Sequence, residues 1–403
     1  MKQRYKYRIY PTPTQRIQLA QLFGCSRVAW NNTLAYCQQL YREGGKYPGF
    51  VALSKRFTAV KKRDTYLWLA DVASVPLQQS LKDLDVAFRN FFSSATGKRK
   101  GPEVRMPRFK KRSNAQSVRF VGTAFSVDQK LRLAKVDGLL KVKWSRELLS
   151  EPSSVTIIKD AAGRYFASFV VELKPELLPW IDKSCGIDLG ISTFATLDDG
   201  TKIDAPKPLK RNLRKLARLQ RCLAKCEKSS NRRKRAAGAL AKVHARIKDI
   251  RTDFLHKLSS KLIRENQSIS IEDLNVSGML KNRKLAKAIS DLGWRTFRTM
   301  LEAKAEMHGR DVAVISRWEP TSQTCSCCGR REGRKSLSVR EWQCLNCGTL
   351  HDRDVNAAVN IKVAGGQSET VNGRRRACKT GLLAVLSDAS SQPCEGQQLS
   401  LCF

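Results

Sequence analysis

The chain has 403 residues, a length that predicts two or three domains. Hydrophobic residues make up 41% of the chain, so we expect packed cores. Its 75 lysines and arginines exceed its 36 acidic residues by 39, which predicts a polyanionic partner, first of all a nucleic acid. The sequence excludes several other classes. It has no apolar run of the roughly 18 residues that a membrane span needs, no phosphate-binding P-loop motif, and no HxH or HExxH pair among its four histidines for a histidine-ligated zinc hydrolase or a histidine-pair strand transferase.

Two further features bear on location and redox state. The first ten residues alternate charged and aromatic side chains and lack the apolar stretch of a signal peptide, so we expect a cytoplasmic, nucleoid-associated protein. Thirteen cysteines in such a chain predict reduced thiols, some of them bound to metal, instead of a disulfide framework.

The N-terminal region begins with a predicted strand. Tyr5, Tyr7 and Ile9 alternate with basic residues, and Pro11 ends the pattern. A helix start follows, with Thr12 as the N-cap and Gln15 closing a capping box. The pattern stays helical to about residue 95, most clearly in one apolar stripe, Leu77, Leu81, Leu84, Phe88 and Phe91. We therefore expect a helical subdomain over 13–97, inserted after the first strand.

A basic, proline-containing segment over 98–112 then predicts an extended connector, either a solvated linker or a segment that contacts a nucleic-acid backbone. Alternating apolar residues over 116–173 predict β-strands, with a hairpin turn at 160–163. We expect these strands to join the N-terminal strand in a β-barrel domain made of 1–12 and 98–180.

The second half begins with a strand, turn and strand over 185–197. Residues 205–251 then hold 17 basic residues against two acids, and their apolar stripes predict a basic two-helix hairpin over 205–262. A short strand, Ile269 to Ile271, ends at Glu272 and Asp273. A helix is expected through His308, then a strand over 312–315, and the tail after about residue 364 shows no clear period.

The strongest local motif is a pair of C-x-x-C knuckles, each followed by glycine. Cys325, Cys328, Cys344 and Cys347 have the spacing of a four-cysteine zinc ribbon, with 15 residues between the two pairs. Cys327 is an extra thiol inside the first pair, but the matching spacing favours the other four. Four thiolate ligands predict a closed, structural zinc site without a water to activate.

Three separated acids form the second motif. Asp188 lies within an apolar strand, where a carboxylate is costly unless it binds a cation, Glu272 ends a strand, and Asp354 begins a predicted helix. Each has an ordinary alternative as a turn, strand-end or N-cap residue, the last especially for Asp354. Together they could hold two Mg²⁺ ions that stabilise the attacking and leaving oxygens of a phosphodiester.

These motifs resemble the transposon-encoded TnpB (OrfB) family over about residues 4–364, through GIDLG at 186–190, SIEDL at 270–274 and HDRDVNAAVNI at 351–361, directly after the ribbon. The resemblance implies an RNA-guided DNA endonuclease related to type V CRISPR effectors. It implies an α+β multi-domain fold: a β-barrel wedge domain with an inserted helical recognition subdomain, a RuvC-like (RNase H-type) nuclease of 184–318 and 351–364, a zinc ribbon at 319–350 and a flexible tail at 365–403.

The resemblance also implies residue roles and partners. Asp188, Glu272 and Asp354 match the catalytic, Mg²⁺-binding acids of the family; Gln78 falls where the family contacts a short duplex motif beside the target, and Arg353 is expected to contact a phosphate. The implied partners are a guide RNA from the transposon end and a matching double-stranded DNA, bound by a monomer. Two alternatives remain open: a transposase or transposase accessory protein, and a guided DNA-binding repressor that does not cut.

Overall fold

The computed structural model describes residues 1–113, 115–336 and 338–366. The chain divides into two compact units. The first contains Met1–Pro175 and Arg211–Asp249, and the second contains Glu176–Lys210 and the described residues from Ile250 onward. Within the described part of the chain, no helix is both long and apolar enough to cross a membrane.

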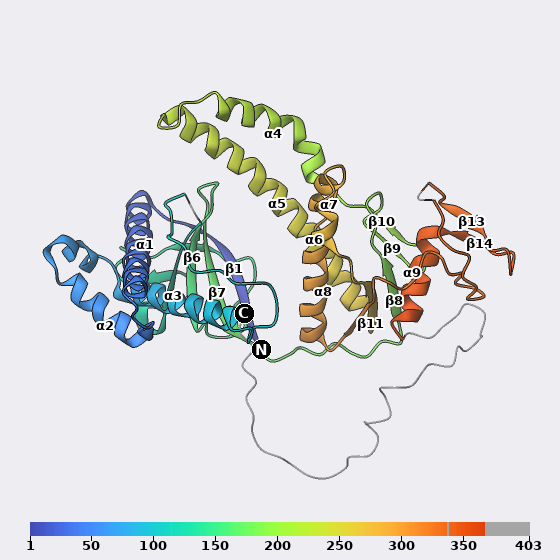
Figure 1. Ribbon diagram of the computed structural model, residues 1–403, viewed down its shortest axis with the longest axis horizontal. Coiled ribbons are helices and arrows are strands. Elements are labelled where there is room, and N and C mark those ends of the chain that lie inside the picture. Colours follow the sequence, from blue (N-terminus) through green and yellow to red (C-terminus); the bar gives the residue numbers. More distant parts are fainter. Residues whose placement is uncertain (114, 337, 367–403) are drawn as a thin grey trace, which may run out of the picture. The chain divides into compact units, whose positions relative to one another are not determined.

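The first unit is built on a five-stranded antiparallel sheet in the order β2-β6-β7-β1-β5, which comprises β1 (Lys2–Tyr10), β2 (Gln116–Val121), β5 (Lys141–Lys143), β6 (Ser154–Lys159) and β7 (Tyr165–Glu172) (Figure 1). The expected alternation in β1 is confirmed, because Tyr5, Tyr7 and Ile9 are buried. A separate ribbon of β3 (Phe125–Val127) and β4 (Leu131–Leu133) follows the short 3₁₀ turn η2 (Gly122–Ala124). Closure of these strands into a barrel stays a prediction.

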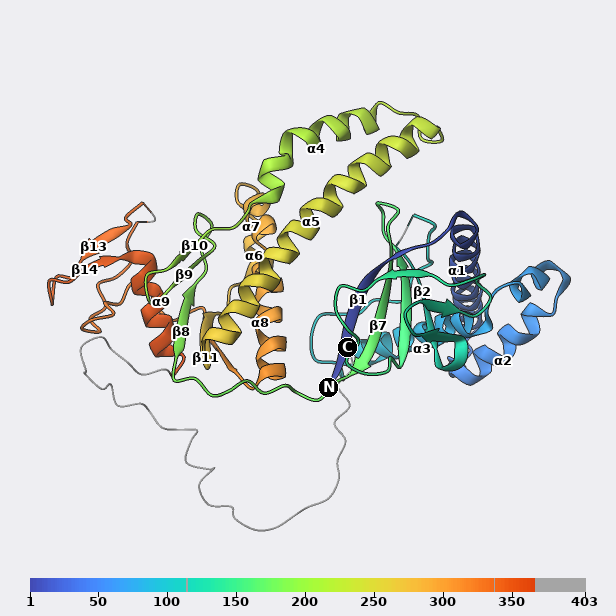
Figure 2. The same ribbon diagram turned by 180° about the vertical axis from the view of Figure 1, so that it is seen from behind.

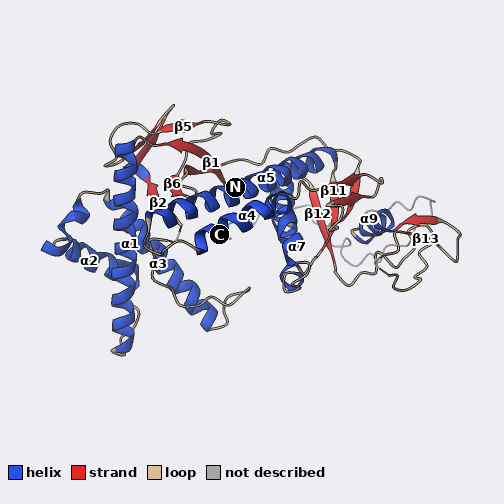
Figure 3. Ribbon diagram, turned by 90° about the horizontal axis from the view of Figure 1, so that it is seen from above, coloured by secondary structure: helices blue, strands red, loops and turns tan. Residues whose placement is uncertain are grey.

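The helices of the same unit are α1 (Pro13–Arg42), α2 (Gly49–Lys61), the 3₁₀ helix η1 (Asp64–Ala70) and α3 (Ser74–Ala95) (Figure 3). Helices α1 and α3 pack on β2 of this sheet, and α2 packs on α3 and η1. The predicted capping box is present, since Thr12 accepts from the Gln15 amide and Gln15 accepts from the Thr12 amide. The apolar stripe of α3 is buried except for Phe91, which is half-buried. The basic connector is not a free linker, because Asn31 pairs with the Lys110 backbone and Trp30 donates to the Arg108 carbonyl at 3.0 Å.

The basic hairpin consists of α4 (Pro208–Ala224) and α5 (Asn231–Glu265), two long helices joined by a short loop (Figure 2). The prediction of its two helices is confirmed. Leu216 on α4, Cys226 in the loop after α4, and Val243 and Ile247 on α5 are buried, while most of the basic side chains of the hairpin are exposed.

The second unit has a mixed five-stranded sheet in the order β10-β9-β8-β11-β12. Its parallel strands are β8 (Ser184–Asp188), β11 (Ser268–Glu272) and β12 (Asp311–Ile315), and its antiparallel strands are β9 (Ala195–Leu197) and β10 (Lys202–Ile203). Cys185, Ile187, Ile269 and Ile271 share a core with apolar residues of α5 and α8 (Trp294–His308). The combination of helices and strands expected from the sequence is therefore confirmed.

One predicted helix is broken in the structure. The segment expected as a single helix through His308 consists of α6 (Val276–Met279), α7 (Ala286–Leu292) and α8. Gly293 separates α7 from α8 with a φ of +76°, in the left-handed region that ends a helix and that glycine adopts without strain. The last elements among the described residues of the unit are the ribbon strands β13 (Glu341–Gln343) and β14 (Leu350–Asp352) and helix α9 (Arg353–Ala364).

Candidate nuclease site and cysteine cluster

Two of the three predicted acids stand at the same edge of the second sheet. β8 and β11 are parallel neighbours, paired from Ser184 with Ser268 to Ile187 with Ile271, so Asp188 and Glu272 follow at the next position of each strand. Side chains alternate across a strand, and Ile187 and Ile271 point into the core shared with α5 and α8. Asp188 and Glu272 therefore point to the opposite face of the sheet.

Helix α9 covers that opposite face and packs on β8 and β11. The approach is so close that a Cβ on Gly186 would lie 2.1 Å from the Ala358 carbonyl oxygen, and one on Gly365 would lie 2.0 Å from the Ser270 hydroxyl. Gly186 precedes Asp188 by two residues on the same strand face, and Asp354 precedes Ala358 by one helical turn. The packing of α9 thus carries Asp354 to the strand edge that bears Asp188 and Glu272.

The electrostatics of Asp188 agree with this convergence. Burial, followed by the negative charges of Asp354 and Glu272, raises the pKa of Asp188 to about 7, and the nearby Arg353 opposes the rise. Burial also raises the pKa of Glu272, with a further contribution from Asp273. Like charges brought together in a partly desolvated place disfavour ionisation, and a bound cation relieves that cost.

The surroundings of the acids are only partly closed. Asp188, Glu272 and Asp354 all keep some solvent exposure, and a cavity of about 380 Å³ opens beside Glu272, lined in part by Asn275, Trp294 and Arg298. The three carboxylates do not form as tight a group as the four cysteines of the ribbon. Among the described residues, those cysteines are the only set of three or more acid, cysteine or histidine side chains whose ligand atoms lie within 4.8 Å of one another.

The N-cap of α9 is Asp352 and not Asp354, the alternative considered from the sequence. Asp352 accepts from the backbone amides of Asp354 and Val355, both at 3.0 Å, and it forms an ion pair with Lys202 on β10 at 2.6 Å. Asp354 lies in the first turn, where its carboxylate is 3.5 Å from the Arg340 guanidinium. The capping role is thus filled by Asp352, and the carboxylate of Asp354 pairs with Arg340 instead of capping the helix.

The other two predicted site residues lie in different surroundings. The guanidinium of Arg353 donates to the Ser336 carbonyl at 2.7 Å, so this side chain is engaged by the ribbon. Gln78 lies in the first turns of α3 in the first unit, with an exposed side chain. Contacts of either residue with nucleic acid stay a prediction.

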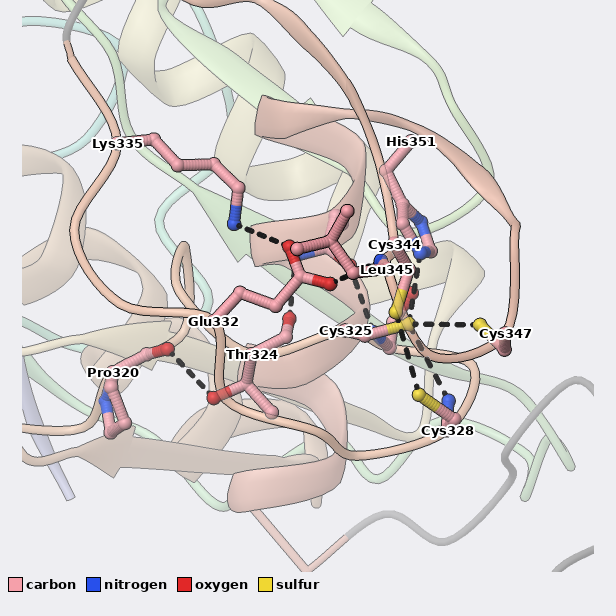
Figure 4. A network of polar contacts seen from close by, with 12 residues as sticks. Pro320, Thr324, Cys325, Cys328, Glu332, Lys335, Cys344, Leu345, Cys347 and His351 are labelled. Atoms are coloured by element: carbon pink, nitrogen blue, oxygen red, sulfur yellow. Dashed lines mark hydrogen bonds and ion pairs between the residues drawn. The ribbon is translucent and has the colours of Figure 1, made fainter.

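The four predicted cysteines converge in the ribbon (Figure 4). Sulfur-to-sulfur distances are 3.7 Å for Cys325 with Cys347 and 3.7 Å for Cys328 with Cys344. A tetrahedral zinc with bonds of about 2.3 Å to sulfur separates its sulfurs by about 3.8 Å, so the cluster fits this metal. Cys327 is not part of the group, as the knuckle spacing predicted.

Three polar residues of the site were not found from the sequence. His351 lies with its Nε2 atom 3.0 Å from the sulfur of Cys325 (Figure 4). Asn356 and Asn360, on one face of α9, both donate to the Thr324 carbonyl, at 2.9 and 2.7 Å. The four-residue spacing of the two asparagines could have indicated a polar helix face, but only the fold reveals which backbone atoms they bind.

Comparisons with known proteins agree with this fold and these motifs. Residues 168–283 match a family model described as "Probable transposase" (OrfB_IS605), residues 294–361 match a "Cas12f1-like, TNB domain", and residues 1–46 match a "Helix-turn-helix domain" of the same OrfB group. A solved structure, "Cryo-EM structure of the Cas12f1-sgRNA-target DNA complex", shares the fold with a TM-score of 0.50 at 13% identity, over 86% of this chain and 82% of that chain. These matches define the class as a transposon-type OrfB protein with the fold of a compact type V CRISPR effector.

The curated relatives then settle the family. A Streptomyces pristinaespiralis protein named "Putative RNA-guided DNA endonuclease" is 41% identical over 96% of both chains. An Escherichia coli K12 protein named "Putative RNA-guided DNA endonuclease InsQ" is 30% identical over 90% of this chain and 92% of its own length. The chain belongs to the TnpB (OrfB) family, and the family resemblance seen in its motifs is confirmed.

Proposed function

We propose that this chain is an RNA-guided DNA endonuclease encoded by an insertion sequence. Its catalytic residues for phosphodiester hydrolysis are Asp188, Glu272 and Asp354. The observation that carries the proposal is the packing of α9 on β8 and β11, which directs three acids from distant parts of the sequence to one edge of the sheet. The relatives named as RNA-guided DNA endonucleases support the activity.

The three acids suit divalent cations with oxygen ligands, of which Mg²⁺ is the one we propose. Such ions, when bound, supply charge stabilisation to the attacking and leaving oxygens of the scissile phosphate. The protein's part is to hold the carboxylates in place: β8 and β11 fix two of them on adjacent strand ends, and the Asp352 cap fixes the first turn of α9, which bears the third.

The cysteine cluster has a different role in this proposal. Four thiolates close the coordination of zinc, so the ribbon metal is structural and takes no part in hydrolysis. We also propose the finer architecture expected from the sequence: a wedge barrel of 1–12 and 98–180, a helical recognition subdomain of 13–97, and a RuvC-like nuclease of 184–318 and 351–364 with the ribbon inserted at 319–350.

The proposed partners are a guide RNA and a double-stranded DNA that matches it, held by a monomer. An excess of 39 positive charges, with 17 basic residues between positions 205 and 251, supports binding of more than one polyanion. In a guided protein, base pairing reads the target sequence, and the protein reads backbone shape and a short flanking motif. Gln78 is our candidate for the residue that contacts that motif, and Arg353 is our candidate for a residue that contacts a phosphate.

The test is cleavage by the purified ribonucleoprotein. Protein expressed with RNA from the end of the element should cut a matched duplex in Mg²⁺, and a changed guide should move the cut. Asp188→Ala should abolish cutting while guided binding stays within a few-fold, and Asp253→Ala, which removes an exposed acid of α5, should cut normally. Binding without any cutting by the wild type would favour the guided repressor, and sequence-specific cutting by RNA-free protein would refute guidance.

A further inference from the structure

Asp354 lies in the sequence between two residues that both contact the first cysteine knuckle, Cys325–Cys328. Three residues before Asp354, His351 places Nε2 3.0 Å from the sulfur of Cys325. Two residues after it, Asn356 accepts a hydrogen bond from the backbone amide of Ser326 at 2.8 Å. The first knuckle therefore contacts the chain on both sides of this acid.

The His351 contact is built into the ribbon. His351 is buried on β14, directly opposite Trp342 of β13, and the centroids of the two rings are 4.7 Å apart. The residue that follows, Asp352, caps α9 through the amides of Asp354 and Val355. A change in the position of His351 would therefore be transmitted within one residue to the start of the helix that carries Asp354.

The Asn356 contact is equally constrained. Asn356 is 2% exposed and uses both ends of its amide, because its nitrogen donates to the Thr324 carbonyl while its oxygen accepts from Ser326. One turn later, Asn360 donates to the carbonyls of Thr321 and Thr324 at 2.8 and 2.7 Å. These bonds hold the segment that enters the first knuckle against α9.

The geometry distinguishes His351 from a metal ligand. The ligand atoms of the four cysteines form a compact group to which His351 does not belong. Two ligands of one tetrahedral zinc, one nitrogen and one sulfur, would lie about 3.6 Å apart, whereas Nε2 lies 3.0 Å from the Cys325 sulfur. This separation suits a hydrogen bond from Nε2 to a thiolate, the kind of outer contact that stabilises a metal-bound sulfur.

We propose that the metal-loaded first knuckle is a clamp that positions Asp354, with His351 and Asn356 as its two positioning residues. The proposal deepens the function proposed above and rests on it for the role of Asp354. Zinc at the four cysteines fixes the knuckle, and the knuckle fixes both sides of the acid. Loss of the His351 contact should therefore weaken two metal sites, the one with sulfur ligands and the one with oxygen ligands.

The experiment compares His351→Phe, which keeps an aromatic ring against Trp342 but has no N–H donor, with His351→Gln, which restores a donor. His244→Phe is the matched control, because His244 is exposed on α5. Release of zinc to a chromogenic chelator reports on the knuckle, the visible spectrum of the Co²⁺-loaded ribbon reports on the number of thiolate ligands, and Mn²⁺ binding measured by electron paramagnetic resonance reports on the acids without RNA or DNA.

We expect His351→Phe to keep the four-thiolate Co²⁺ spectrum, to release zinc about tenfold faster, and to bind Mn²⁺ at the acids several-fold more weakly, since removal of an outer contact costs about 10–100-fold in metal affinity. His351→Gln should recover most of both losses. Wild-type zinc release or wild-type Mn²⁺ affinity in His351→Phe would overturn the clamp, and so would a three-thiolate spectrum, which would make His351 part of the coordination. If these metal results hold but the wild type does not cut DNA, the proposed function fails while the clamp stands.

Discussion

At the scale of the residue, Gly186 sets how closely α9 can approach the sheet. Its missing side chain leaves room for the Ala358 carbonyl and for Lys362, and the Lys362 ammonium pairs with Asp198 at 2.8 Å. The sequence alone showed Gly186 only as part of the GIDLG motif, because the motif does not reveal that a helix from residue 353 onward occupies the space above the glycine. Ile187 and Ile271, in contrast, stand in segments that the sequence predicts as strands, and both are buried.

Gly186→Ala should separate α9 from β8. The added Cβ would meet the Ala358 oxygen at 2.1 Å, so the helix must shift, at a cost of at least about 2 kcal/mol in the free energy of unfolding. Cutting should be lost with the shift of Asp354. Denaturant unfolding and a cleavage assay would measure both effects.

The control for this prediction is Gly238→Ala on α5, where nothing lies within 4 Å of the added atom. It should stabilise the helix by about 1 kcal/mol, because alanine replaces glycine in a helix interior. Equal stability of Gly186→Ala and the wild type would contradict the close approach described here.

Asp188→Asn tests the charge at the acid site. Asp ionises near pH 4 in an unfolded chain, at about its ordinary value, while the folded pKa is raised to about 7. Metal-free protein therefore loses stability as the pH rises from about 4 to about 7 and stays less stable above that, because the unfolded state releases its proton first. Asn cannot ionise, so the variant should melt several degrees above the metal-free wild type at pH 8 and at a similar temperature near pH 4.

The same two proteins, the wild type and Asp188→Asn, can be compared with and without Mg²⁺. A cation at the acids should raise the melting temperature of the wild type at pH 8 and affect Asp188→Asn much less. A wild type that Mg²⁺ does not stabilise, measured by calorimetry at pH 8, would argue against an ion at these acids.

At the scale of the element, hydrogen bonds join the ribbon and α9. The four cysteines and their separation from Cys327 could be predicted from the repeated spacing of the knuckles. The bonds from Asn356 and Asn360 to the knuckle entry could not, because they depend on where the ribbon turns back onto the helix. The same limit explains the missed break at Gly293, since a glycine within a helical pattern is often tolerated and only its positive φ identifies a helix end.

Cys344→Ser should remove the metal from the ribbon and loosen β13, whereas Cys327→Ser should keep it. The reason is that Cys344 supplies one of four thiolates and Cys327 supplies none. Elemental analysis of purified protein should give one zinc per chain for the wild type and Cys327→Ser and a clear loss for Cys344→Ser. Unchanged zinc in Cys344→Ser would exclude this set of ligands.

At the scale of the whole molecule, charge is the property most directly read from the sequence. The excess of 39 positive charges predicted a nucleic-acid partner before any motif was considered. The motifs then indicated the family, and the comparisons confirmed it. Charge does not reveal which surface holds RNA and which holds DNA, because lysine and arginine contact the phosphates of both in the same way.

RNA-free protein should bind DNA without sequence preference, and the binding should fall about a thousandfold between roughly 50 and 200 mM salt, as several phosphate contacts are lost together. RNA-loaded protein should bind a matched duplex with a much smaller dependence on salt, because base pairing supplies the specificity. Filter binding across a salt series would measure both, and a shallow dependence for the RNA-free protein would argue against a phosphate-based interface.

The placement of the third acid on α9 has a consequence for the order of synthesis. Translation makes Asp188 and Glu272 early and Asp354 only after the whole ribbon, because α9 begins at Arg353. Until that helix is made, Gly186 lacks its contact with Ala358, Ser270 lacks its contact with Gly365, and the strand edge bears only two acids. A nascent chain, or a fragment that ends within the ribbon, would therefore carry the basic residues of 205–251 but only two of the three acids proposed for cleavage.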